Sequence, residues 1–470
     1  MTSSIAAPTG TLQRRIGLRA AVALNMLEMI GVGPFITLPL VIAAAGFHLS
    51  VWAWVLGAAL AVADGLVWAE LGAAFPRAGG SYAFLREIYG PDGAGNWLSF
   101  LYVWQVSFTA PLSIASGCIG LSSFLSFFWP GLDGTPFAAL PMLHYANFAA
   151  AAACLLVTAL LYRNLRSVTR LAWVLFAGVL AALTGVIVSG FAHAAATGGW
   201  QMPTAPALHF SAAMSGLAQG TLLATYCYWG YYNICFLGSE TRQPEKTIPR
   251  AILLSVLFVS GFYVAMNLAA LPSLRDAAAH ASQSAIVRVQ LVADIAHSAF
   301  GLWAGYLVAA LIVWTAFASV FSLLLGYSRV PYAAARDGNY FRFLAAVHPK
   351  HAIPHRSLIA LGLVASLFCF FTLQQVITML VITRILLQFF LQQAGVILLR
   401  IQRPELNRPF KMPLYPLPPL VAMAGFVFIL VNRSHALGGL AVAGGIALSG
   451  TLIYLVRARS LRQWPFAFEK

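Results

Sequence analysis

An acidic residue stands shortly before a glycine- and proline-rich interruption in the first long apolar stretch of the chain. The stretch covers about residues 16–45 and contains Glu28, Gly31, Gly33 and Pro34. A charged side chain at membrane depth costs about 2.5–3.5 kcal/mol on insertion scales. A broken helix is tolerated there only where it is buried in protein or lines a water-filled cavity. An acid beside such a break is therefore a candidate ion or substrate site.

We expect two half-helices around this break. The first ends near Ile30, and the second starts at Pro34, because proline suits the first helical position. The free N–H groups around Gly33 and Phe35 then point into the gap, as do the last carbonyl groups of the first half-helix. Such a site can bind a zwitterion, with its carboxylate at the N–H groups and its ammonium at the carbonyls. The alternative is an ordinary Gly/Pro kink in a packed helix.

The composition is that of a polytopic membrane protein. Of 470 residues, 60% are hydrophobic and only 9% are charged, whereas a soluble domain carries about 25% charged residues. The net charge of +15 reflects the loops and does not indicate a nucleic-acid partner. The five cysteines lie in apolar segments without metal-ligand spacing, so we expect packing residues. No cofactor, metal site or nucleophile–base pair is expected, and hence no enzyme.

Twelve apolar segments are long enough to span a bilayer. They are residues 16–45, 51–75, 95–128, 144–163, 169–191, 211–238, 250–271, 301–327, 356–373, 374–399, 415–432 and 436–457. The boundary between the ninth and tenth, near Thr372–Gln374, is the least defined. The predicted class is an all-α membrane protein with twelve transmembrane helices.

The basic residues set the predicted orientation, because cytoplasmic loops carry the excess of Lys and Arg. With the N-terminus inside, 24 of the 28 basic residues fall in inner segments. The outer segments hold Arg275, Arg288 and Arg433, and Arg384 is intramembrane. The sequence therefore predicts a multi-pass protein of the cell (inner) membrane, with cytoplasmic tails at 1–15 and 458–470.

The sixth apolar segment repeats the pattern of the first. Residues 228–233 read Tyr-Trp-Gly-Tyr-Tyr-Asn and place Gly230 and Asn233 inside an apolar run. The two interruptions lie about 200 residues apart in helices that run in opposite directions. This pattern is typical of an inverted repeat whose broken helices meet at the midplane. We predict repeats over 16–191 and 211–399, followed by two extra helices over 415–457.

Two more charges lie at membrane depth. Asp64 stands in the second segment, and Arg384 stands in the tenth, with glutamines following at helical spacing. An intramembrane arginine needs a carboxylate partner. We therefore expect Arg384 to pair with Asp64 or Glu28. The small-residue segment Pro76–Gly80 predicts a short inner element that acts as a gate hinge.

The chain resembles the amino acid–polyamine–organocation superfamily, which has the leucine-transporter fold. The motif 31–35, Gly-Val-Gly-Pro-Phe, is similar to the glycine-x-glycine-isoleucine-phenylalanine break of that family. Further matching segments are residues 69–87, 238–252, 335–338 and 403–416. The resemblance covers nearly the whole chain. It implies secondary transport of amino acids or related amines by alternating access.

The resemblance also implies where a substrate binds. Its carboxylate would meet the backbone of Val32 and Gly33, and its ammonium would meet carbonyls near Ile30 and Tyr228. The rings of Tyr228, Trp229 and Tyr231 would close over it. The candidate substrate-binding residues are Glu28, Ile30, Gly31, Val32, Gly33, Pro34, Phe35, Tyr228, Trp229, Gly230, Tyr231 and Asn233. The candidates for ion coupling or buried charge are Glu28, Asp64 and Arg384.

The coupling ion is open at this point. Some proton-coupled relatives carry a lysine in helix 5, which this chain lacks, and Ser319 and Ser322 suggest a sodium site or simple packing. We favour H⁺ over Na⁺, carried by Glu28 or Asp64, because burial favours the neutral form of a carboxylate.

Three functions compete. The first is a proton-coupled amino acid permease. The second is a polyamine or cationic amino acid transporter, in which Glu28 is the counter-ion of the substrate. The third is a transporter-like receptor that binds without translocating. The substrate, import versus exchange, accessory subunits and the oligomeric state are not predicted.

Overall fold

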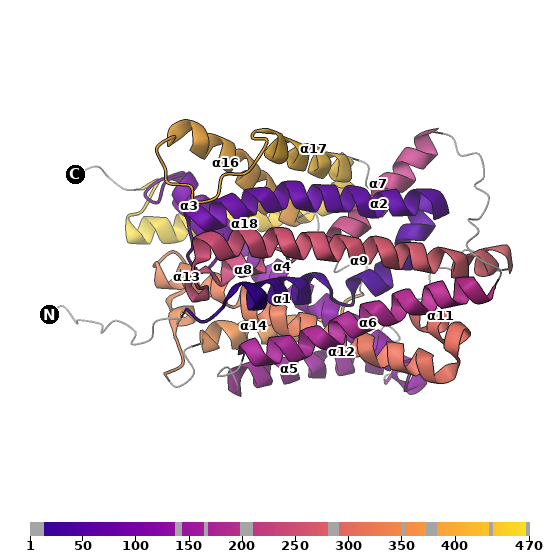
Figure 1. Ribbon diagram of the computed structural model, residues 1–470. Helices are drawn as coiled ribbons and strands as arrows, with labels where there is room; N and C mark the ends of the chain where they lie inside the picture. The colour runs from indigo at the N-terminus through magenta and orange to yellow at the C-terminus, as the bar shows by residue number, and fades with distance from the viewer. Residues whose placement is uncertain are drawn as a thin grey trace.

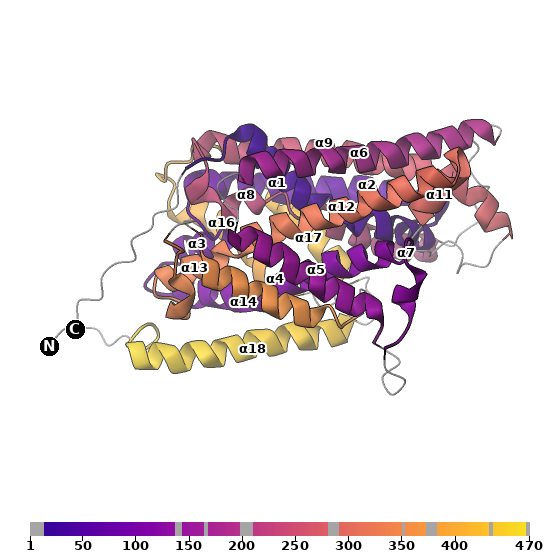
Figure 2. The same ribbon diagram turned by 90° about the horizontal axis from the view of Figure 1, so that it is seen from below.

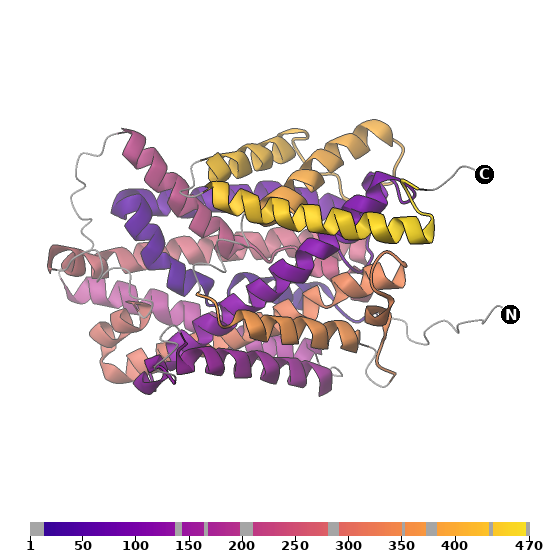
Figure 3. The same cartoon turned by 180° about the vertical axis from the view of Figure 1, so that it is seen from behind.

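The computed structural model describes residues 14–136, 143–163, 168–197, 210–280, 291–349, 353–372, 383–431 and 436–466. Helices run side by side along one direction, so the molecule is a bundle with two ends (Figures 1 and 3). The helices of more than 18 residues are α2 (Gly33–Ala74), α4 (Ala94–Leu125), α5 (Tyr145–Arg163), α6 (Val168–Ala196), α7 (Phe210–Tyr228), α9 (Pro244–His280), α12 (Leu302–Tyr327) and α18 (Ala436–Leu461). Shorter ones include α1 (Leu18–Met29), α11 (Leu291–Phe300), α14 (His355–Phe368), α16 (Phe390–Gln402) and α17 (Leu417–Val431).

The all-helical class is confirmed. Within the described residues, eight helical stretches are long and apolar enough to cross a membrane. The count of twelve stays a prediction, since the expected division between the ninth and tenth segments falls at residues 373 and 374, outside the described residues. Part of the expected outer segment, residues 281–290, also lies outside them.

Helix α1 ends at Met29 and α2 begins at Gly33, so the first predicted break is confirmed. The second helix starts one residue before the expected Pro34. The range of α2 also includes the gap at 46–50 between the first two predicted segments. Gly46 has φ +76° and non-helical backbone angles, so the chain kinks there between two helical stretches. Only glycine adopts this φ without strain.

Helix α2 lies at the centre of the bundle and packs most extensively against α7 and α9. In contrast, α18 lies along one edge (Figure 2). The indole N–H groups of Trp97 and Trp104 on α4 attach it through Thr451 and Ser449, at 3.3 and 3.1 Å. The cavity described below is lined by residues of other elements.

One end of the bundle, hereafter the α3 end, carries α3 (Ser81–Ile88) and α13 (Arg329–Arg336). Ion pairs join its segments: Arg86 with Asp337 at 2.8 Å, Arg77 with Glu87 at 3.1 Å and Arg329 with Glu240 at 2.9 Å. The hydroxyl group of Tyr82 also donates to Asp337, at 3.1 Å. Burial, and next the negative charge of Asp337, raises the pKa of Tyr82, so this donor keeps its proton.

Candidate functional site

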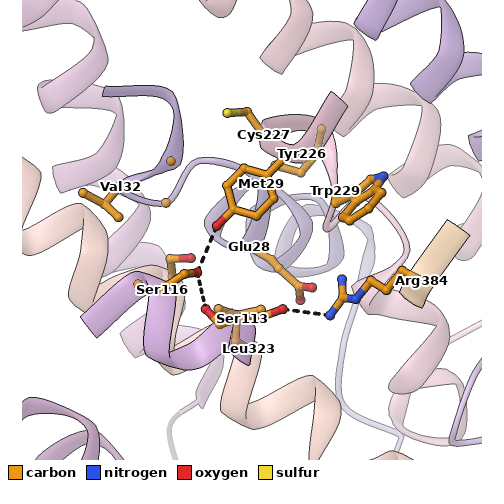
Figure 4. Close-up of a pocket in the computed structure, with 14 residues that line it drawn as sticks. Glu28, Met29, Val32, Ser113, Ser116, Tyr226, Cys227, Trp229, Leu323 and Arg384 are labelled. Carbon is orange, nitrogen blue, oxygen red and sulfur yellow. Dashed lines mark hydrogen bonds between the residues drawn. The ribbon is translucent and has the colours of Figure 1, made fainter. Parts of the chain in front are cut away.

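A cavity of about 50 Å³ lies where the two helix breaks meet (Figure 4). Residues from α1 and its break, α4, the end of α7, α12 and the tenth segment line it. They are Glu28, Met29, Gly31, Val32, Gly33, Ser113, Ser116, Gly117, Tyr226, Cys227, Trp229, Ser319, Leu323 and Arg384. A water molecule needs only about 10–15 Å³ on this measure, so the space suits a few waters or a small solute.

The backbone of the first break supplies hydrogen-bond donors. Pro34 has no N–H, and the N–H groups of Phe35 and Ile36 donate to the Val32 carbonyl, at 3.2 and 3.3 Å. The Phe35 N–H is therefore not free, contrary to our expectation. The donors at the cavity belong to the stretch from Gly31 to Gly33, which lines it.

The carbonyl ends of the two broken helices face one another. The hydroxyl group of Tyr263 on α9 lies 2.7 Å from the Met29 carbonyl oxygen and 3.2 Å from the Cys227 carbonyl oxygen. Both residues line the cavity. Each carbonyl has a second lone pair, which an ammonium group can use. We expected the ammonium group to meet carbonyls near Ile30 and Tyr228. The carbonyls at the cavity belong to the residues just before them, Met29 and Cys227.

The Glu28 side chain is the anionic group of the cavity. It is 6% exposed, and its Oε2 atom is buried with no hydrogen-bond partner in the described part of the chain. Its carboxylate points toward the guanidinium group of Arg384 (Figure 4). An unpartnered buried oxygen costs about 1–3 kcal/mol. Glu28 is therefore ready to accept a donor from a bound solute.

Arg384 does not form the direct ion pair that we expected. Its guanidinium group donates to the hydroxyl groups of Tyr232, at 2.9 Å, and Ser113, at 2.8 Å. It also lies over the rings of Trp229 and Tyr327, 5.7 and 5.1 Å from their centroids, in cation–π geometry. Hydroxyl and aromatic groups thus satisfy the cation, and Glu28 stays near it without a salt bridge.

A π-helix presents Arg384 to the cavity. Arg384 immediately precedes a π-helical turn over Ile385–Phe389, after which α16 continues as an α-helix. Such turns are rare and occur frequently at functional sites.

Asp64 lies outside the cavity lining. It is fully buried on α2 and accepts short hydrogen bonds from the Tyr231 hydroxyl group and the Gln393 amide. Asp64, the other carboxylate that we expected to pair with Arg384, therefore has neutral hydrogen-bond donors as its partners.

Several predicted substrate contacts serve other roles. Of the expected residues, Ile30, Pro34, Phe35, Tyr228, Gly230, Tyr231 and Asn233 do not line the cavity. The Tyr228 hydroxyl group donates to the Trp54 carbonyl, at 3.2 Å, and Asn233 donates to Ser322, at 2.8 Å. Aromatic residues at the second break thus mostly pack between helices, and Trp229 is the one predicted ring that reaches the cavity.

The sequence reasoning missed the wall that α4 contributes. Ser113, Ser116 and Gly117 are small residues at positions i, i+3 and i+4, which share one helix face. The Ser116 hydroxyl group bonds to that of Tyr226, at 2.9 Å. This spacing of small polar residues in an apolar helix was the available signal, since such residues often face a helix interface.

Discontinuous helices that meet at a polar cavity inside an apolar helical bundle define a membrane transporter. The chain belongs to the amino acid permease family, whose model matches residues 16–456. The family lies within the superfamily that the motifs resemble, so the recognition from sequence is confirmed, as is the absence of an enzymatic role.

Characterised relatives are amino acid transporters. The serine/threonine exchanger SteT of Bacillus subtilis is 28% identical over 442 residues, which cover 89% of this chain and 91% of the relative. The Asc-type amino acid transporter 1 of Mus musculus is 26% identical over 425 residues, covering 89% and 76%. An uncharacterized transporter of Mycobacterium tuberculosis is 29% identical over 355 residues, covering 76% and 73%.

Proposed function

We propose that the protein is a proton-coupled secondary transporter of small neutral amino acids. The observation that carries this proposal is the cavity at the two breaks, where backbone N–H groups, backbone carbonyls and Glu28 surround one small space. The α-carboxylate binds the N–H groups of Gly31 to Gly33, at the start of α2. The α-ammonium binds the carbonyl groups of Met29 and Cys227.

The size and polarity of the cavity favour a short side chain. A volume of about 50 Å³ suits a side chain such as that of serine, threonine or alanine, and three serines, Ser113, Ser116 and Ser319, line the space. The names of two relatives, a serine/threonine exchanger and an Asc-type amino acid transporter, support this substrate class.

The charge balance argues against the polyamine alternative. Glu28 and Arg384 are the two charged residues in the lining, and they carry opposite signs. A diamine would bring two positive charges next to a fixed guanidinium group, and like charges in a desolvated site repel strongly. A zwitterion brings no net charge. Its ammonium can use Glu28 as a second acceptor.

The polar contacts also favour H⁺ over Na⁺. Ser322 donates to the Leu24 carbonyl oxygen, at 2.9 Å, and accepts from Asn233, so its oxygen is engaged in packing. Of the two serines considered for sodium, Ser319 alone reaches the cavity. Two buried carboxylates, Glu28 and Asp64, offer proton sites instead.

The proposed architecture is the inverted repeat of 16–191 and 211–399, working by alternating access in the cell membrane. We place the α3 end in the cytoplasm, because the basic residues gather in the segments predicted to be inner. The ion pairs at that end then hold the inner gate closed, and their separation opens the cavity to the cytoplasm.

Binding of radiolabelled L-serine to the purified protein in detergent tests the proposal. We expect saturable binding that L-threonine and L-alanine displace and putrescine does not. Glu28→Gln should weaken it by about tenfold, since a hydrogen bond to a charged group contributes about 1.5–3 kcal/mol. Displacement by putrescine in place of amino acids would support the polyamine transporter. Binding in detergent without uptake into liposomes would support the receptor.

A further inference from the structure

The two buried carboxylates have surroundings of different kinds. Glu28 lies in the cavity beside the Arg384 guanidinium group, whereas Asp64 lies away from it and accepts from two neutral donors. We propose that Asp64 carries the coupling proton, and that Glu28 serves in the substrate site. This assignment rests on the proposed function and names the group that couples it to protons.

The assignment follows from how proteins hold buried charge. A cation within a few ångströms favours the ionised form of a carboxylate, whereas burial without a cation favours the neutral form. Glu28 faces the Arg384 guanidinium group (Figure 4), although no salt bridge joins the two side chains among the described residues. Within the described residues Asp64 forms no ion pair, and its exposed fraction is 0%. Asp64 is therefore the carboxylate that can bind and release a proton during the cycle.

The groups that interact with Asp64 are neutral, and they include the Trp68 indole one turn further along α2. The break after α7 presents Tyr231 and, beyond it, Tyr232; both are phenols. Helix α16 presents the amide of Gln393, and α9 presents Ile252 against the neighbouring Gly65. Helix α16 also carries a cation, Arg400. It pairs with Glu70, nearer the α3 end.

The position of Asp64 connects a proton to the moving parts. Tyr231 belongs to the second helix break, and Gln393 follows the π-turn that begins after Arg384. A carboxylate accepts from both donors. When water delivers a proton to one of its oxygens, that oxygen becomes a donor and one of the two hydrogen bonds weakens. Protonation thus loosens either the break or α16 from α2.

Buried polar atoms lie between Asp64 and the α3 end. Gln392 accepts from the Ser81 hydroxyl group, at 2.6 Å. The Gln392 Nε2 and Gln393 Oε1 atoms are buried and lack a partner among the described residues, and water satisfies such atoms.

Proteoliposomes containing wild type, Asp64→Asn or Glu28→Gln test the assignment. Two readouts are needed: counterflow of labelled serine, which needs no proton gradient, and uphill accumulation driven by an imposed pH gradient. We expect Asp64→Asn to keep counterflow and to lose accumulation. Glu28→Gln should raise the half-saturating serine concentration by about tenfold, while its residual uptake still follows the pH gradient. Asp92→Asn, at an exposed turn, is the matched control and should behave as wild type.

The outcomes distinguish a failure of the proposed function from a failure of the assignment of Asp64. No amino acid counterflow in the wild type would overturn the proposed function and this assignment with it. Counterflow in the wild type with full uphill accumulation by Asp64→Asn would overturn the assignment alone.

If Asp64→Asn does not fold, Tyr231→Phe and Gln393→Leu replace it. Each removes one donor that stabilises the ionised carboxylate, so the pH midpoint of driven uptake should move up by about one unit. An unchanged midpoint in both variants would contradict the role of Asp64.

Discussion

The α-carbon of Gly230 packs directly against the peptide backbone between Glu28 and Met29. A side-chain carbon at Gly230 would lie 2.8 Å from both the Glu28 Cγ atom and the Met29 nitrogen. Gly230 also has φ +128°, which L side chains rarely adopt. The breaks of the two discontinuous helices are therefore in contact, and only a glycine permits it.

Gly230→Ala should abolish transport by pushing the two breaks apart. The added methyl group would displace the backbone beside Glu28, and a shift of about 1 Å in a site can cost about 100-fold in rate. Serine counterflow in proteoliposomes measures the effect. Gly261→Ala on α9 is the control, because nothing lies within 4 Å of a Cβ atom there. Equal counterflow by both variants would show that close contact of the breaks is not required.

Arg384→Gln should lower serine affinity by about 10- to 100-fold. The change removes the donors that hold Tyr232 and Ser113 in place. Ser113 belongs to the cavity wall, and a displacement of about 1 Å in a site can cost about 100-fold. Equilibrium binding in detergent measures it, with the exposed Arg342→Gln as control. Unchanged affinity would place Arg384 outside the recognition site.

Asp337→Asn should shift the protein toward a state that is open at the α3 end. Asp337 accepts from Arg86 and Tyr82, and both bonds lose their charged acceptor in this variant. The carboxylate and guanidinium side chains are partly exposed, 38% and 25%, so we expect about 1 kcal/mol, or about a fivefold shift. Labelling of a cysteine introduced at Ala83 reports the opening. No change in its labelling rate would mean that this pair does not hold the gate.

Glu70→Gln should destabilise the protein without changing substrate affinity. Glu70 is 1% exposed and accepts two hydrogen bonds from Arg400, one of them at 2.9 Å, and one from the Met412 N–H, at 2.8 Å. The buried Arg408 Nε atom also lies 3.5 Å from its carboxylate. Breaking a buried pair leaves an uncompensated cation, at a cost of about 3–5 kcal/mol. Thermal unfolding in detergent measures this, with the exposed Glu405→Gln as control. Equal melting temperatures would show that the pair contributes little.

The two helix breaks could be predicted from sequence because their causes are local. Gly31, Gly33 and Pro34 interrupt a helix wherever they occur, and Gly230 does so among aromatic residues. The gap between the first two predicted segments, at 46–50, contains the kink at Gly46. The apolar pattern does not show that one glycine with positive φ makes this turn.

The partners of the buried charges could not be predicted in the same way. Charge counting pairs an arginine with a carboxylate, but Arg384 uses the hydroxyl groups of Tyr232 and Ser113. Likewise, Tyr228 packs against the backbone of Trp54 and away from the cavity. These contacts join helices that are more than 100 residues apart in sequence. The periodicity of one segment does not show which neighbour each face of its helix will meet.

Uptake by proteoliposomes of a panel of labelled small neutral amino acids and diamines, with and without an imposed pH gradient, tests the central claim most directly. Wild-type protein should accumulate a small neutral amino acid, such as serine, only when the pH gradient is imposed, and should take up no diamine. Gradient-independent uptake of a diamine, with no amino acid uptake, would contradict the account and make Glu28 the counter-ion of a cationic substrate.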